Sequence, residues 1–140
     1  MDQNRIFGPF LGMMLLTLLV WIYMYTRRLG MIRSRNLDPQ QLTPGELARV
    51  SPPDVSNPSD NLKNLFEMPV LFYALLLYLF VAGQVDQAYL VAGWLFVLFR
   101  ALHSAIHCTI NIVAVRFTIY ILSCGCLFFI LLRAASDYFS

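Results

Sequence analysis

The sequence predicts an all-α membrane protein, built as an antiparallel, up-and-down bundle of four transmembrane helices. Of its 140 residues, 59% are hydrophobic and only 13% are charged. The apolar residues gather into stretches of about 20 residues, which is the length of helix that crosses a bilayer core. Only short polar segments separate the last three stretches, so these helices must be antiparallel neighbours. A net charge of +2 without a basic cluster argues against nucleic-acid binding.

The predicted spans cover residues 6–25, 65–83, 88–108 and 113–133. The first span ends at Thr26-Arg27-Arg28, and it is longer than a signal peptide and lacks a small-residue cleavage site. In the second span Pro69 falls in the first turn, where a missing amide hydrogen bond costs least. Residues 84–87 and 109–112 form the two tight turns. We therefore expect one membrane domain over residues 1–140.

The long polar segment, residues 27–64, is predicted to be an irregular or partly helical loop. Within it, Thr43-Pro44-Gly45-Glu46 has the pattern of a helix start, with Thr43 as the cap. Most basic residues of the chain lie in this segment: Arg27, Arg28, Arg33, Arg35, Arg49 and Lys63. By the positive-inside rule, the loop faces the cytoplasm and both termini lie on the other side of the membrane.

Polar residues inside the spans form the candidate site, because each is costly to bury in a membrane without a partner. Helical spacing places these residues on one face of each of three helices, toward the end of the bundle that carries the loop. The third span contributes Arg100, His103 and His107, the fourth Arg116, Tyr120 and Ser123, and the second Asn64 and Glu67. Arg100 lies about two turns inside its span. We therefore expect an acceptor such as Glu67 beside it.

Two plainer readings of these residues stay open. Long polar side chains near the span ends, such as Lys63 and Arg116, could lie at the lipid headgroups without any partner. A structural ion pair alone would also satisfy Arg100. A metal site is not expected, because His103 and His107 are the only histidines of the chain and catalytic zinc usually takes three protein ligands.

The combination of these residues resembles the MAPEG family, the membrane-associated proteins in eicosanoid and glutathione metabolism. The resemblance covers about residues 6–133. It rests on four short spans, a long first loop, Asn64-x2-Glu67 and the run from Arg100 through His103 and His107 to Arg116. The spacing is similar to that of microsomal prostaglandin E synthase and microsomal glutathione transferase. The run from Asn57 to Pro69 looks more like their bacterial relatives, which implies a bacterial inner membrane protein.

Membership would imply a homotrimer that binds glutathione between neighbouring subunits, near the cytoplasmic end. By resemblance, Asn64 and Glu67 hold the peptide backbone of glutathione, and Arg116 stabilises its thiolate. The remaining predicted contacts to this co-substrate are Lys63, Arg100, His103 and Tyr120. A nearby cation lowers the pKa of a thiol from about 8.5, so more nucleophile is present at neutral pH.

Two positions depart from the family pattern. His107 stands where many members have a tyrosine, although its imidazole could donate a hydrogen bond to a thiolate or act as a base. Asp60 stands where many members have an arginine, and its carboxylate would repel a carboxylate of glutathione.

Two functions follow from this sequence. The first is a membrane transferase or peroxidase that uses glutathione or a related thiol on small apolar electrophiles or lipid peroxides, with Arg116 and His107 as catalytic residues. The second is a non-catalytic membrane protein that binds lipid or acts as a scaffold on the same fold.

Overall fold

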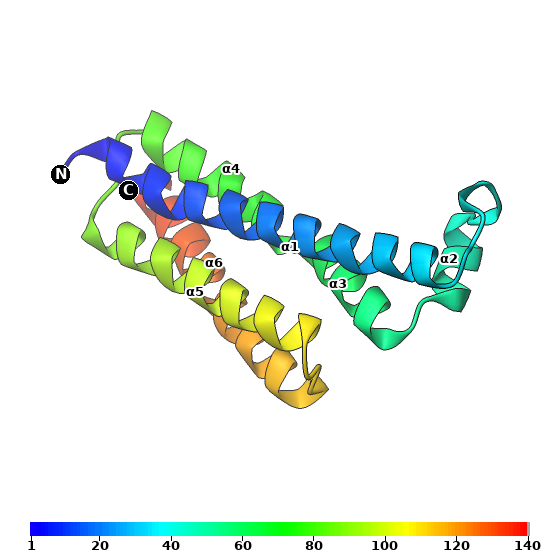
Figure 1. Ribbon diagram of the computed structural model, residues 1–140. Coiled ribbons are helices and arrows are strands. Elements are labelled where there is room, and N and C mark those ends of the chain that lie inside the picture. Colours follow the sequence, from blue (N-terminus) through cyan, green and yellow to red (C-terminus); the bar gives the residue numbers. More distant parts are fainter. Residues whose placement is uncertain (140) are drawn as a thin grey trace.

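The computed structural model describes residues 1–139, and its regular secondary structure over these residues is helical, as Figure 1 shows. Its elements in chain order are the 3-10 helix η1 (Gln3–Ile6), α1 (Phe7–Ser34), the 3-10 helix η2 (Pro39–Gln41), α2 (Pro44–Val50), α3 (Pro53–Asn64), α4 (Met68–Val81), α5 (Gln87–Cys108) and α6 (Val113–Phe139). Four helical stretches are long and apolar enough to cross a membrane: residues 3–34, 53–81, 87–108 and 113–139. The predicted membrane-protein class and the four-helix bundle are therefore confirmed.

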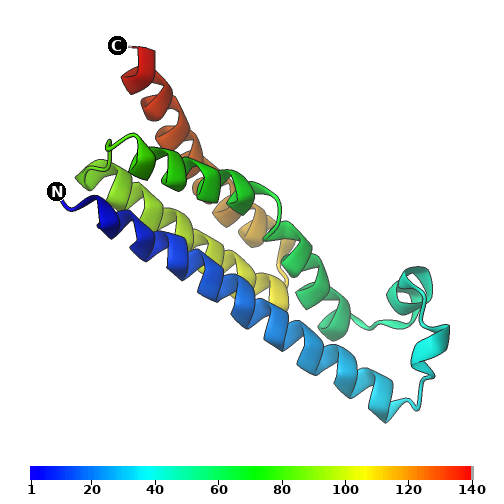
Figure 2. The same cartoon turned by 90° about the horizontal axis from the view of Figure 1, so that it is seen from above.

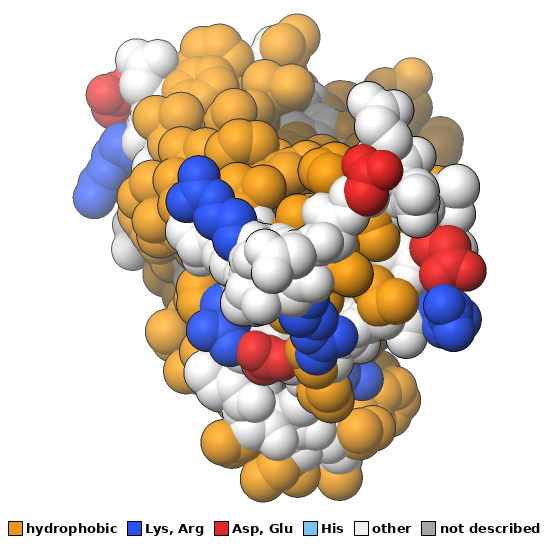
Figure 3. All heavy atoms as spheres, turned by 45° about the vertical axis from the view of Figure 1, so that its right-hand side comes forward, with side chains coloured by type: hydrophobic (Ala, Val, Ile, Leu, Met, Phe, Trp, Pro, Cys, Tyr) orange, Lys and Arg blue, Asp and Glu red, His pale blue; other side chains and the backbone are white. Residues whose placement is uncertain are grey.

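The bundle is antiparallel, with α1 lying beside α3 and α5 and with α5 packed along α6 (Figures 1 and 2). Both termini lie at the end opposite α2, as an even number of spans requires. Figure 3 looks onto the α2 end, where side chains of both charges gather among apolar ones. Exposed ion pairs form there, including Arg49 with Glu46 at 2.9 Å and Lys63 with Asp60 at 3.0 Å.

The first helix continues to Ser34, well past the boundary expected at residue 25. Its extension is held by α3, because Arg27 forms an ion pair with Asp54 and Arg28 Nη2 donates to Ser59 Oγ at 3.1 Å. These contacts give the helix a partner surface outside the predicted span. The segment between the first two spans therefore contains less irregular chain than its composition suggests.

Helix α3 forms despite Pro53 and Pro58, because the amide hydrogen bond that each lacks is either not needed or replaced. Pro53 occupies the first turn, where the amide would have no helical partner. Pro58 lies inside the helix and cannot bond to the carbonyl of Asp54, but Arg27 Nε donates to that oxygen at 3.4 Å instead. Thr43 caps α2 as predicted, accepting from Glu46 N at 3.3 Å.

The second span is interrupted where α3 ends and α4 begins. Leu65 still closes a helical turn, but Glu67 has φ −98° and ψ −103°, which is not helical. Backbone that leaves the helix at membrane depth needs protein partners, because lipid offers none. The break lies beside α5, where Arg100 donates to the main-chain oxygen of Asn64, the last residue of α3.

The core lies between α1, α4, α5 and α6 and is apolar. Phe72 of α4 stacks on Phe96 of α5, with ring centroids 4.2 Å apart. α1 and α5 approach closely, since a Cβ added at Gly93 would lie only 3.1 Å from the ring of Pro9. Gly83 ends α4 with φ +67°, a conformation that favours glycine.

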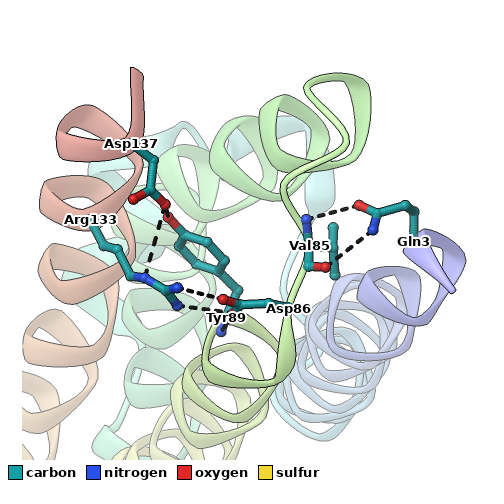
Figure 4. A network of polar contacts seen from close by, with 6 residues as sticks. All are labelled: Gln3, Val85, Asp86, Tyr89, Arg133 and Asp137. Carbon is teal, nitrogen blue, oxygen red and sulfur yellow. Dashed lines mark hydrogen bonds and ion pairs between the residues drawn. The ribbon is translucent and has the colours of Figure 1, made fainter. Parts of the chain in front are cut away.

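A polar network fixes the opposite end of the bundle, shown in Figure 4. Asp86 begins α5, where its Oδ1 accepts from Tyr89 N at 3.0 Å, and it forms a two-point ion pair with Arg133 of α6. The buried Tyr89 hydroxyl donates to Asp137 Oδ2 at 2.7 Å, and the Arg133 guanidinium lies 4.4 Å from the centroid of its ring. The network therefore ties the turn before α5 to the last turns of α6.

We expect Asp86→Asn to lower the free energy of unfolding by no more than about 1 kcal/mol at neutral pH, because the ion pair is partly exposed and asparagine keeps the helix cap. The hydrogen bond from Arg133 lowers the pKa of Asp86 below its ordinary value of 3.8. The ionic stabilisation is therefore complete above the pKa of the unfolded chain and is lost as the pH falls through the lower folded pKa. Thermal unfolding in detergent should show the two proteins converging below about pH 4, and a gap that stays constant would contradict this account.

Candidate functional site

The site is a layer of buried polar side chains at the loop end of the bundle, built around Arg100. Its side chain is fully buried on α5. Arg100 Nη2 donates to both oxygens of Asn64, at 3.2 Å to the main-chain carbonyl and at 2.5 Å to Oδ1. Asn64 ends α3, and its main-chain oxygen accepts from Glu67 N at 3.3 Å in a tightened last turn, which leaves this oxygen open to a second donor.

Glu67 is not the direct partner of Arg100 that the sequence analysis expected. Within residues 1–139, no carboxylate oxygen lies within 4.0 Å of the Arg100 guanidinium. Glu67 Oε2 instead accepts from Asn64 Nδ2 at 3.1 Å, so Asn64 stands between the cation and the carboxylate. The reason is the break at residues 65–67, which leaves Glu67 exposed beyond the end of α3.

The predicted aromatic and imidazole groups do come together. The Arg100 guanidinium carbon lies 5.6 Å from the centroid of Tyr120, whose ring is 5.9 Å from that of His103. His103 and His107 are both buried, with ring centroids 5.6 Å apart. The stripe expected on α5 therefore faces α6.

Arg116 joins this layer through both its backbone and its side chain. His103 Nδ1 lies 3.2 Å from the main-chain oxygen of Arg116, so this ring nitrogen carries the proton and donates. Arg116 Nη1 donates to Asn111 Oδ1 in the turn between α5 and α6. The guanidinium is only partly buried and has no carboxylate within 4.0 Å among the described residues.

Lys63 lies apart from this cluster. Its ammonium group pairs with Asp60 and its side chain is 74% exposed. The ion pair also reduces the repulsion that Asp60 would exert on glutathione, because its carboxylate already has a cation beside it. Lys63 lines a groove of about 490 Å³ with Trp21, Tyr25 and Arg28, on the α1 side of α3.

Asn64 belongs to a row of three asparagines on α3, of which the other two, Asn57 and Asn61, were not expected as site residues. Asn57, Asn61 and Asn64 are spaced i, i+4 and i+7, so they share the face of the helix that meets α5. Asn57 Oδ1 accepts from Asn111 at 3.1 Å, and the buried Asn61 binds Ser104 and Cys108. This spacing was the signal that could have found them.

Several buried nitrogen atoms of the layer have no hydrogen-bond partner among residues 1–139: Arg100 Nε and Nη1, His103 Nε2 and His107 Nδ1. A buried polar atom left unpaired costs about 1–3 kcal/mol, and more when it is charged. The arrangement can therefore bind an anionic, hydrogen-bonding ligand, with Arg116 presenting a further cation at its edge.

The comparisons agree with the fold. The sequence model of the MAPEG family matches residues 6–136 of the chain. Comparisons with curated proteins and with solved structures gave no significant match. Because the family match covers nearly the whole chain and all four membrane-spanning helices, the protein belongs to the MAPEG family, the membrane-associated proteins in eicosanoid and glutathione metabolism.

Proposed function

We propose that this protein is a membrane transferase or peroxidase that uses glutathione, or a related low-molecular-weight thiol, on small apolar electrophiles or lipid peroxides. It acts as a homotrimer in a bacterial inner membrane, with residues 27–64 on the cytoplasmic side. The thiol binds between subunits at the polar layer, and the apolar acceptor arrives through the bilayer.

The observation that carries this proposal is the fully buried guanidinium of Arg100, which has no carboxylate partner within the described part of the chain. A cation in a membrane interior is expensive unless an anion accompanies it. Asn64 supplies only neutral oxygens, and no described residue gives an acceptor to the Nε and Nη1 atoms of the guanidinium. A carboxylate of glutathione would supply both the missing acceptor and the compensating negative charge, because hydrogen bonds between ionised groups are stronger than those to neutral oxygens.

The other groups of the layer match the rest of the same ligand. Glu67 holds the ammonium group and Asn64 the peptide backbone, while His103 and Tyr120 complete the pocket wall. Lys63 faces the second carboxylate from the α1 side. Each of these pairings is between opposite charges or between a donor and an acceptor.

Arg116 and His107 carry the chemistry. The positive charge of Arg116 stabilises the thiolate, which raises the fraction of nucleophile at neutral pH. His107 donates a hydrogen bond to the sulfur or takes its proton, because an imidazole does either near neutrality. The thiolate then adds to the electrophilic carbon of an acceptor or displaces its leaving group. With a peroxide it attacks one oxygen, the O–O bond breaks and the alcohol leaves with a proton. A second thiol then converts the sulfenic acid that forms on sulfur to a disulfide and water.

A comparison of two ligands tests the role of Glu67. The wild-type protein should bind glutathione about tenfold more tightly than its N-acetyl derivative, which lacks the ammonium group, because a charge-assisted hydrogen bond contributes about 1.5 kcal/mol or more. Glu67→Gln should lose most of this preference. Glu46→Gln is the matched control, since Glu46 pairs with Arg49 on α2, away from the layer. Equal preference in all three proteins would remove Glu67 from the site.

A lipid-binding scaffold is the second candidate, and one observation favours it. An apolar groove of about 720 Å³ runs between α5 and α6, lined by residues such as Val91, Leu95, Phe99 and Phe129. A lipid chain fits such a surface, as does an apolar substrate. Substitution of Arg116 separates the two candidates, because a scaffold does not need a thiolate-stabilising cation.

A further inference from the structure

The guanidinium of Arg116 is held by a relay of two asparagines that come from different parts of the chain. Arg116 Nη1 donates to Asn111 Oδ1, and Asn111 Nδ2 donates to Asn57 Oδ1 at 3.1 Å. Asn57 lies on α3, Asn111 in the turn after α5, and Arg116 in the first turn of α6. The relay thus connects three elements at the loop end of the bundle.

The backbone of the turn fixes Asn111 as firmly as its side chain does. Asn111 has φ +46°, a left-handed conformation that asparagine tolerates better than most residues. Its N–H donates to the carbonyl of Ile106 at 2.8 Å, which anchors the turn to the end of α5. The amide oxygen is therefore presented to Arg116 from a rigid position.

Asn111 holds the Arg116 guanidinium through a neutral amide, a contact that we call the clamp. A guanidinium has five N–H donors, and Asn111 takes one of them without adding a negative charge. The ordinary partner of an arginine is a carboxylate, which would compensate the charge. An amide instead restricts the side chain while leaving its positive charge and its remaining donors for a ligand.

We propose that Asn111, supported by Asn57, is a positioning residue that holds the Arg116 guanidinium against the sulfur of the bound thiol. The neutrality of the clamp keeps the cation effective in lowering the pKa of that thiol. The inference rests on the proposed function and adds two residues to the same site. Asn57 and Asn111 act only through Arg116.

Two substitutions at Asn111 separate orientation from charge. Asn111→Gly keeps the left-handed backbone and removes the clamp, whereas Asn111→Asp keeps a clamp of the same shape and makes it anionic. A cation close to a thiol lowers its pKa by about 1–3 units. We therefore expect the pKa of bound glutathione to rise by about one unit in both variants. Asn57→Ala should change the thiol pKa in the same direction but by less.

The position of Arg116 has a readout that does not involve a thiol. Phenylglyoxal modifies exposed guanidinium groups, and mass spectrometry reports the labelling of each arginine in the detergent-purified, full-length protein. Labelling of Arg116 should speed up several-fold in Asn111→Gly and slow down in Asn111→Asp. Arg100 is the internal control, because it is fully buried and should stay protected in every variant that is folded.

Asn36→Gly is the matched control. Asn36 is also a left-handed asparagine, with φ 49°, but it lies in the turn after α1. This variant should alter neither the thiol pKa nor the labelling of Arg116. Any change common to both asparagine positions would therefore reflect backbone flexibility instead of the clamp.

The thiol pKa is read from the ultraviolet absorbance of the thiolate during a pH titration of the complex. Opposite labelling changes in Asn111→Gly and Asn111→Asp, together with a raised thiol pKa in both, support the assignment. Normal glutathione binding with an unaltered thiol pKa in both variants overturns it and leaves the proposed function standing. Failure of the wild-type protein to bind glutathione would overturn the proposed function first and the assignment with it.

Discussion

Arg116→Ala is expected to lower the turnover of glutathione by about 10²–10³-fold, the usual effect of removing one group that stabilises a developing anion. Binding of glutathione should change much less, because Arg100, Asn64 and Glu67 remain. The fold should persist, since the only side-chain hydrogen bond described for the Arg116 guanidinium is the one to Asn111. Single-turnover kinetics and size-exclusion chromatography in detergent measure the two properties.

Arg116→Lys provides the graded control for this variant. A lysine keeps the positive charge but loses the planar fork that Asn111 orients. Its turnover should therefore fall between those of the wild-type and alanine proteins. Loss of the assembly in Arg116→Ala, or unchanged function, would instead favour the lipid-binding scaffold.

Arg100→Met is expected to weaken glutathione binding by about thirtyfold or more, because truncating one partner of a buried charge pair costs at least about 2 kcal/mol. The thermal midpoint of the ligand-free protein should not fall. Methionine removes two buried guanidinium nitrogen atoms that have no acceptor, which offsets the donor that Asn64 loses. Binding and stability should thus respond in different ways.

Ser104→Ala is the matched control for Arg100→Met. Ser104 is a buried neighbour on α5 whose hydroxyl donates to Asn61 Oδ1 at 3.3 Å, and it has no proposed contact with the ligand. This variant should lose about 1 kcal/mol of stability and keep its affinity for glutathione. A large loss of stability in Arg100→Met with unchanged affinity would show that Arg100 is structural.

The hydrophobic pattern was sufficient to predict the membrane class and the four spans, because each span must present an apolar surface of bilayer length. It could not show that α1 continues to Ser34 or that α3 forms, since both depend on contacts between the two helices. The ion pair of Arg27 with Asp54 lies outside any hydrophobic pattern. Pro58 removes one hydrogen bond from α3, and the donor that replaces it, Arg27 Nε, comes from another helix that the sequence pattern does not place.

Helical spacing correctly grouped Arg100 with His103 and His107, because residues three and four apart share a face. The partner of Arg100 was harder to predict. The break at residues 65–67 leaves Asn64 as its acceptor and turns Glu67 toward the surface. Helical periodicity could not identify Asn111, because it lies in a turn. Its side chain contacts Arg116 from a backbone that adopts a left-handed conformation.

Our central claim is that the buried guanidinium of Arg100 binds an anionic group of a thiol ligand. The most direct test is equilibrium binding of glutathione to the detergent-purified wild-type protein, with Arg100→Met and Ser104→Ala measured alongside. The account predicts saturable binding that Arg100→Met abolishes or weakens by at least about thirtyfold, while Ser104→Ala binds normally. Absence of wild-type binding up to about 10 mM, or equal binding by all three proteins, would contradict it.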